Sequence, residues 1–290
     1  MLVTWIRDTY SAEDSGVLRR AIDVIASPLA YHGFASNGVY VFFDPMTQAV
    51  LYIGLARDLS ERFAQHNGLV HMRPEGCKVR EVRAWMRGHG ALGYAIAVQS
   101  SFSQAGVARQ RGTPTAAFYD EESGEFWGYD DEGLDHIADV EAQLIASFQE
   151  RHQRLPPWNK IHGRRTAFNA PTTNTYALLE LAAGRTDSLL LSRRTIRELA
   201  ASPDALLREE TMHVGRMGAL EDTFGLGIDS AEIIKSLYRR VHMPQYADTG
   251  LVEAWDELCT ADYWHEPPPP PATESIPGQV PATVLTPRTI

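Results

Sequence analysis

Residues 38–66 read GVYVFFDPMTQAVLYIGLARDLSERFAQH, and the rest of the fold follows from this stretch. Two short apolar runs flank the turn-forming sequence DPMTQ, which predicts a β-hairpin. Each run carries a tyrosine beside a glycine, as GVY at 38–40 and as YIG at 52–54. The segment that follows has a helical pattern and places Arg62 and His66 one turn apart. We therefore expect a hairpin and a helix that bring several polar side chains together.

The register of this hairpin determines whether its two tyrosines face each other. Successive residues of a strand point to opposite faces, so Tyr40 and Tyr52 share a face only if paired positions have an even sum. A three-residue loop at 45–47, closed by Asp44 and Gln48, gives such a register and sets Tyr40 opposite Tyr52. The sequence therefore predicts that both hydroxyls emerge on one face, beside the following helix.

The helix after the hairpin carries its own start signal. Asp58 and Glu61 form a D-x-x-E capping box, which predicts that the helix begins near Asp58. Arg62 and His66 lie at the edge of an apolar stripe formed by Leu59, Phe63 and Val70. A single tyrosine, arginine or histidine in such a place is most often a core residue or a cover for apolar surface. Together, however, four polar groups converge on one patch.

A carboxylate interrupts the apolar pattern of the helix predicted over residues 135–153. Glu141 lies in the centre of the apolar stripe of this helix, which comprises Ile137, Val140, Leu144, Ile145 and Phe148. A buried carboxylate is costly unless it is paired, binds a cation or opens into a cleft. An ion pair with Arg62 or Arg151 is therefore the structural alternative to a role for Glu141 in a functional site.

The remaining segments complete the prediction of an α+β fold. A helix is expected over 12–30, with Val17, Ala21, Ile22 and Ile25 on one face. A short helix over 78–88 and a third strand over 90–100 give a small antiparallel three-stranded sheet flanked by helices. We expect four regions: an N-terminal helical segment at 1–36, a domain at 37–165 with an insertion at about 101–134, a helical C-terminal domain or extension at 170–264, and a disordered Pro-rich tail at 265–290.

The composition is that of a globular protein with unevenly placed charge. The 290 residues are 44% hydrophobic and 22% charged, and the net charge is −10. This charge disfavours indiscriminate binding of nucleic acid, yet basic residues cluster at 73–87, 151–165 and 185–197. No apolar run approaches the roughly 18 residues of a membrane span, so no membrane contact is expected. Two distant cysteines fit a cytoplasmic protein.

With these residues identified, the chain resembles the GIY-YIG nuclease superfamily. The resemblance covers residues 38–163 and rests on six elements in order: the tripeptides at 38–40 and 52–54, Arg62, His66, Glu141 and Asn159. Two departures are evident. Leu55 stands where many members carry a lysine, so the residue at this position cannot perform the role of that lysine. The acidic insertion next to Glu141 is also atypical and could restrict a nucleic-acid groove.

The resemblance implies a metal-dependent endonuclease that hydrolyses phosphodiester bonds, with DNA as the expected substrate. It makes Glu141 the ligand for Mg²⁺ or Mn²⁺ and gives Arg62 the task of holding the scissile phosphate. Tyr40 or Tyr52, supported by His66, would orient the attacking water and accept its proton. The sequence leaves open which of the two tyrosines does this.

The resemblance also bears on Asn159 and on the partners of the chain. Asn159 would position groups around the metal, and the helical C-terminal region would recognise the target, bind a protein partner or self-associate. A competing hypothesis comes from another class of protein. In it, the chain is a catalytically retired nuclease fold that binds nucleic acid or protein and acts in regulation, with its groove guarded by the acidic insertion.

Overall fold

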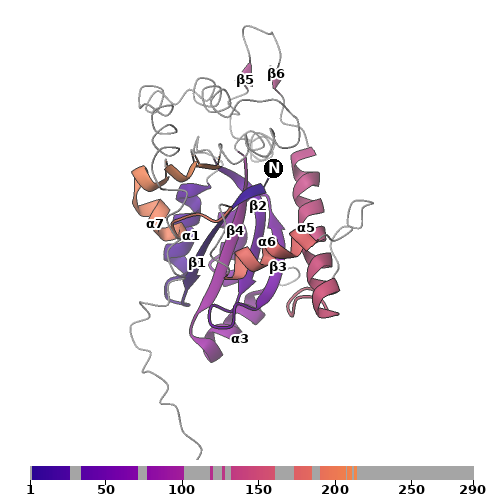
Figure 1. Ribbon diagram of the computed structural model, residues 1–290. Helices are drawn as coiled ribbons and strands as arrows, with labels where there is room; N and C mark the ends of the chain where they lie inside the picture. Colours follow the sequence, from indigo (N-terminus) through magenta and orange to yellow (C-terminus); the bar gives the residue numbers. More distant parts are fainter. Residues whose placement is uncertain are drawn as a thin grey trace, which may run out of the picture.

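Both faces of the main β-sheet are buried, and this explains why its strands are apolar almost throughout. The computed structural model describes residues 2–26, 34–70, 77–100, 118–119, 126–127, 132–160, 173–184, 190–206, 208–210 and 212–213. Four antiparallel strands form the main sheet in the order β1-β4-β2-β3 (Figure 1). They span Leu2–Tyr10 (β1), Phe34–Phe43 (β2), Val50–Ala56 (β3) and Leu92–Ser100 (β4).

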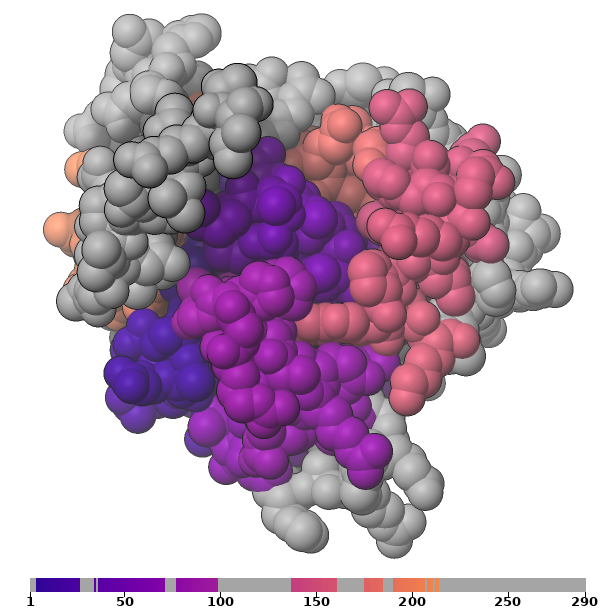
Figure 2. Space-filling view, turned by 90° about the horizontal axis from the view of Figure 1, so that it is seen from below, coloured from indigo at the N-terminus to yellow at the C-terminus, as the bar shows by residue number. Residues whose placement is uncertain are grey.

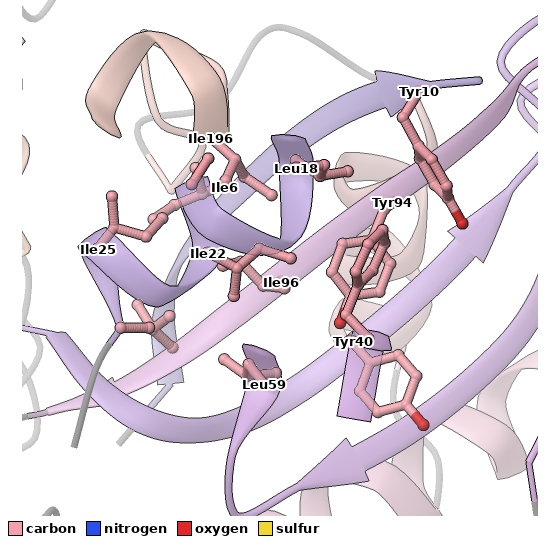
Figure 3. Close-up of a cluster of buried hydrophobic side chains, with 14 of the residues drawn as sticks. Ile6, Tyr10, Leu18, Ile22, Ile25, Tyr40, Leu59, Tyr94, Ile96 and Ile196 are labelled. Atoms are coloured by element: carbon pink, nitrogen blue, oxygen red, sulfur yellow. The ribbon is translucent and has the colours of Figure 1, made fainter. Parts of the chain in front are cut away.

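Helices cover the two faces of this sheet and make the fold α+β. One face is covered by α1 (Ser15–Ile25), α2 (Leu59–Asn67), α3 (Val79–His89) and α7 (Ile196–Ala201). The other face is covered by α5 (Glu132–His152) and α6 (Thr173–Ala183). Figure 3 shows the first face, where the tyrosine rings lie beside the aliphatic side chains of α1: Tyr10, Tyr40, Tyr94, Leu18, Ile22 and Ile25.

The prediction of three strands and of an exclusively helical segment over 1–36 is wrong, because β1 forms a fourth strand at the sheet edge. Arg7 and Asp8 are buried in this strand, at 7% and 4% exposure, and they obscure its apolar pattern in the sequence. Arg197 donates to the Asp8 carboxylate at 2.8 Å from a position 189 residues downstream. In α1, Leu18 is buried and Val17 is 45% exposed, contrary to the predicted face.

The described C-terminal residues pack on the same sheet. Leu191 forms a parallel bridge with Trp5 of β1, and the amide of Ser192 donates to the Trp5 carbonyl at 2.7 Å. Buried side chains of α6 and α7 belong to the two cores that flank the sheet. The described part of 173–213 therefore packs against the main sheet. Residues 214–290, with the predicted Pro-rich tail, lie outside the described residues.

Little of the predicted insertion at 101–134 lies within the described residues. Two short strands, β5 (Phe118–Tyr119) and β6 (Phe126–Trp127), pair antiparallel, as its aromatic sequence predicts. Among the described helices, none combines the length and the apolar character needed to cross a membrane.

Candidate active site

Tyr40 and Tyr52 lie on the same face of the sheet, as predicted, although they are not directly opposite each other. Tyr40 pairs with Gly54. The turn closes at Ala49 and is therefore one residue longer than predicted, and a bulge at Leu51 adds a second residue. Each change adds one to the sum of paired positions. The sum stays even, so the register is wrong and the shared face is retained.

Gly54 is the residue that allows the two tyrosine rings to meet. A Cβ atom at this position would lie 2.6 Å from both Cζ and Oη of Tyr40, and 2.7 Å from Cε1 of Tyr52. The two ring centroids are 5.8 Å apart. Because a packed interior cannot accommodate such approaches, any larger residue at position 54 must displace a ring.

Helix α2 begins as predicted, because the Asp58 carboxylate accepts a hydrogen bond from the amide of Glu61 at 2.8 Å. The helix ends before Val70, which is therefore not part of its apolar stripe. His66 is 0% exposed and Arg62 is partly exposed. Of the two polar residues predicted at the edge of the stripe, only Arg62 reaches the surface.

A directed chain of hydrogen bonds leads from α3 to the tyrosines. The backbone amide of Lys78 donates to Nδ1 of His66 at 2.9 Å, so the proton of the neutral imidazole is on Nε2. Nε2 lies 2.6 Å from Oη of Tyr40 and donates to it. Burial, and then the charges of Arg62 and Lys78, lower the pKa of His66 to about 3. His66 is thus a neutral donor at physiological pH.

Tyr52 lies at the end of this chain. The hydroxyl of Tyr40 donates to that of Tyr52. Tyr40 is 1% exposed, and burial raises its pKa well above the usual value. Tyr52 is partly exposed; burial and the charges of Glu141 and Glu81 raise its pKa, whereas the Tyr40 hydrogen bond and Arg62 lower it. Of the two tyrosines, Tyr52 is the one that a substrate can contact.

Glu141 reaches the edge of the sheet from the opposite face. Helix α5 packs on the face away from the tyrosines, and the carboxylate of Glu141 accepts a hydrogen bond from the amide of Leu55. Strand β3 is an edge strand, which leaves that amide free for a side-chain partner. Burial raises the pKa of Glu141 to about 7, while the Leu55 amide and the charge of Arg62 act in the lowering direction.

Glu141 forms no ion pair with another residue of the part of the chain that the structure describes. The ion pair expected as an alternative, with Arg62 or Arg151, is therefore not found there. Arg151 instead lies 5.7 Å from the ring centroid of Tyr176. Glu141 remains a half-buried carboxylate without a paired cation.

A single divalent cation fits this carboxylate. A buried oxygen ligand whose ionised form lacks a counter-charge is stabilised by a bound cation. In the residues that the structure describes, no group of three or more His, Cys, Asp or Glu side chains is arranged to hold a metal. A cation at Glu141 would therefore complete its coordination with water and substrate oxygens, as Mg²⁺ readily does.

Asn159 pairs with the backbone of β3 instead of facing the hydroxyls. Its Nδ2 donates to the carbonyl of Ile53 at 2.8 Å, and its Oδ1 accepts from the Ile53 amide at 3.0 Å. The preceding residue, Trp158, donates its amide to the Leu51 carbonyl at 2.9 Å. Asn159 thus docks the segment after α5 along the edge strand.

The structure arranges the other predicted site residues in two layers. Tyr52, Arg62 and Glu141 form the outer layer: Arg62 lowers the pKa of the other two, and Glu141 raises that of Tyr52. Tyr40 and His66 are buried behind Tyr52. Figure 2 shows that the segments carrying the outer layer, from 34–70 and 137–160, adjoin residues 77–98 on one face of the molecule.

Lys78 belongs to this site, although the sequence marked it only as a member of a basic cluster. Its Nζ lies 4.9 Å from the ring centroid of Tyr52. Lys78 follows His66 by 12 residues and precedes α3, and this position alone does not reveal that it packs against Tyr52.

Comparison with known proteins provides no relative for this chain. No family model matches it, and neither a curated protein nor a solved structure does. The function is therefore argued from the residues of the site and their chemistry.

Proposed function

We propose that this chain is a divalent-metal-dependent endonuclease of the GIY-YIG type that hydrolyses phosphodiester bonds in DNA. The observation that carries the proposal is the convergence of Tyr52, Arg62 and Glu141 from β3, α2 and α5 at one sheet edge. A hydroxyl, a guanidinium and a cation-binding carboxylate are the groups needed to place a water, hold a phosphate and compensate its growing charge.

Arg62 is the candidate for the phosphate. Its Nη1 donates to Oε1 of Gln65 at 3.1 Å, which orients the guanidinium along the helix surface. The remaining donors of its planar group suit the oxygens of a phosphodiester. When bound to Glu141, Mg²⁺ or Mn²⁺ would supply Lewis acidity at the leaving oxygen and cancel the carboxylate charge that raises the pKa of Tyr52.

Tyr52 is assigned the attacking water, and Tyr40 and His66 support it. In this series of hydrogen bonds the donors are arranged toward the Tyr52 oxygen. His66 donates to Tyr40, and Tyr40 donates to Tyr52. A donor at that oxygen stabilises the negative charge left when the hydroxyl gives up its proton. Tyr40, buried and with its hydroxyl hydrogen committed, acts on the reaction through Tyr52.

The surface near α3 supports a polyanionic partner. Arg80, Arg83 and Arg87 are exposed on this helix. A hollow of about 320 Å³ lies between α1, α2 and α3, and Arg83 and Arg87 line it together with Asn67 and Met86. In a chain with a net charge of −10, local arginines of this kind are the means of contacting a phosphate backbone. We place this activity in the cytoplasm.

A plasmid-nicking assay tests the proposal. Supercoiled DNA incubated with the full chain and Mg²⁺ or Mn²⁺ should become nicked or linear, and EDTA should prevent this. Arg62→Ala, prepared in the same way, is the matched control for contaminating nucleases. Intact plasmid in both metals, together with retained DNA binding, would favour the retired nuclease fold that acts only as a binding module.

A further inference from the structure

Lys78 is a buried cation whose backbone is fixed by hydrogen bonds. The residue is 7% exposed. It is the N-cap of α3: its carbonyl accepts from the amide of Val82 at 2.8 Å, and its own amide donates to His66. Within the described ranges its ammonium forms no ion pair, although the charge of Glu81 is near enough to raise its pKa. A buried ammonium is costly, so its placement requires a reason.

The ammonium lies over the ring of Tyr52, with 4.9 Å between Nζ and the ring centroid. A cation over a neutral phenol gains a modest attraction from the electrons of the ring. Over a phenolate, the same cation faces a full negative charge in a site with little water, and the attraction is several times larger. The contact therefore stabilises the deprotonated form of Tyr52 more than the neutral form.

We propose that Lys78 is a positioning residue for Tyr52, whose ammonium holds the ring and supplies the positive charge that its deprotonated hydroxyl requires. This inference rests on the proposed function for the role of Tyr52 toward the attacking water.

Other charged and titratable groups also surround Tyr52 and Lys78. Tyr52 is faced by Tyr40 from β2, Arg62 and His66 from α2, Glu81 from α3 and Glu141 from α5. The charge of Lys78 itself is influenced by Glu81, Lys160 and Cys77, and burial has the largest effect, lowering its pKa. His66 is neutral, and Arg62, which lowers the pKa of Tyr52, is also assigned to the phosphate; Lys78 is the cation that lies against the Tyr52 ring itself.

Two substitutions separate charge from shape. Lys78→Met keeps an unbranched side chain and removes the charge, whereas Lys78→Arg keeps the charge. The full chain is labelled with carbon-13 tyrosine, the Tyr52 signal is assigned with Tyr52→Phe, and its midpoint is followed by NMR as the pH rises. Lys78→Met should raise this midpoint by about one pH unit or more, and Lys78→Arg should leave it near the wild-type value. Arg20→Met, which removes an exposed cation on α1, should not change it.

Cleavage by the same proteins gives the second measurement. Lys78→Met should lower the rate about tenfold near neutral pH and recover it as the pH rises, and Lys78→Arg should retain most of the wild-type rate. If wild-type protein does not cleave but the midpoint shifts, the proposed function fails and the pairing of Lys78 with Tyr52 stands. If cleavage occurs and the variant loses rate equally at every pH, or if the Tyr52 midpoint is unchanged by Lys78→Met, the inference is overturned.

Discussion

Glu141 shows how one residue can be prominent in a sequence and still be explained only by the structure. Its place in the apolar stripe of a helix was readable from spacing, because Ile137 and Leu144 flank it at helical intervals and both are buried. Its partner was not readable, because the amide of Leu55 is offered by the edge of a sheet. The carboxyl group therefore sits where burial favours its neutral form.

This environment predicts a pH-dependent cost that Glu141→Gln removes. The pKa of Glu141 is raised from 4.5 to about 7, so between these values the unfolded chain releases a proton that the folded chain keeps. Stability in EDTA then falls as the pH rises through this window. Near pH 8, Glu141→Gln should be more stable than the wild type by about 1–3 kcal/mol in urea unfolding, and the difference should vanish near pH 4. A variant less stable at pH 8 would indicate that Glu141 compensates a buried cation.

Gly54 allows a test of the tyrosine pair that does not touch a polar group. Gly54→Ala places a methyl group against both rings, so it should lower stability by about 1–3 kcal/mol and displace the hydroxyls. Gly88→Ala, on α3, has no neighbouring atom within 4 Å and should be neutral or stabilising. Thermal unfolding and nicking of both variants are the measurements. Full activity and stability in Gly54→Ala would show that the rings are not packed as described.

The difference between Tyr40 and Tyr52 could not be predicted from the sequence. Any register with an even sum puts both on one face, and this much was correct. Their exposure depends on the order of strands: β2 is central, between β4 and β3, whereas β3 is at the edge. Tyr40 is consequently buried and Tyr52 is not, which separates a supporting role from one in contact with substrate.

The elements of the site are arranged around β3, whose outer edge has no neighbouring strand. Trp158 and Asn159 pair with its backbone from the segment after α5, and Glu141 receives the amide of Leu55. An edge strand that is covered in this way is protected from pairing with other chains. The hydrogen bond from the Leu55 amide also sets the position of Glu141 relative to the face of the sheet that carries Tyr40 and Tyr52.

Asn159→Ala and Arg62→Ala should therefore behave differently. Asn159→Ala removes both hydrogen bonds to Ile53 and should cost about 1–3 kcal/mol, with faster hydrogen exchange at the Ile53 amide and reduced cleavage.

Arg62→Ala should abolish cleavage and change the unfolding midpoint little, because the Arg62 side chain is partly exposed and bonds only to Gln65 within the described residues. A large stability loss in Arg62→Ala would instead assign it a structural role.

Viewed as a whole, the molecule is held together by contacts that join its two ends. Strand β1 pairs with β4, and Leu191 forms a parallel bridge with Trp5 of β1. Arg197 binds the Asp8 carboxylate and the Thr9 carbonyl. The sequence predicted the hairpin, α2, α3, β4 and α5 because their signals are local. It missed β1, which pairs with the distant β4, and it left open whether the C-terminal helices pack on the sheet, because contacts such as that of Arg197 with Asp8 span 189 residues.

This arrangement predicts that residues 37–165 do not fold alone. The fragment lacks β1, α1, α6 and α7. The edge of β4 that pairs with β1, and much of both apolar cores, would therefore face water. The isolated fragment should show no cooperative thermal transition by circular dichroism, whereas the full chain should show one. Cooperative unfolding of the fragment would mean that the nuclease-like region is an independent domain after all.

The most direct test of the central claim is a single-turnover cleavage experiment with the wild type and Glu141→Gln on the same fluorescent DNA duplex. Binding is recorded by anisotropy before Mg²⁺ is added, and strand cleavage is recorded afterwards. Gln keeps the shape of Glu141 and removes the charge that holds a cation, so the variant should bind the duplex and leave it intact, while the wild type cleaves it. Undiminished cleavage by Glu141→Gln would contradict the account.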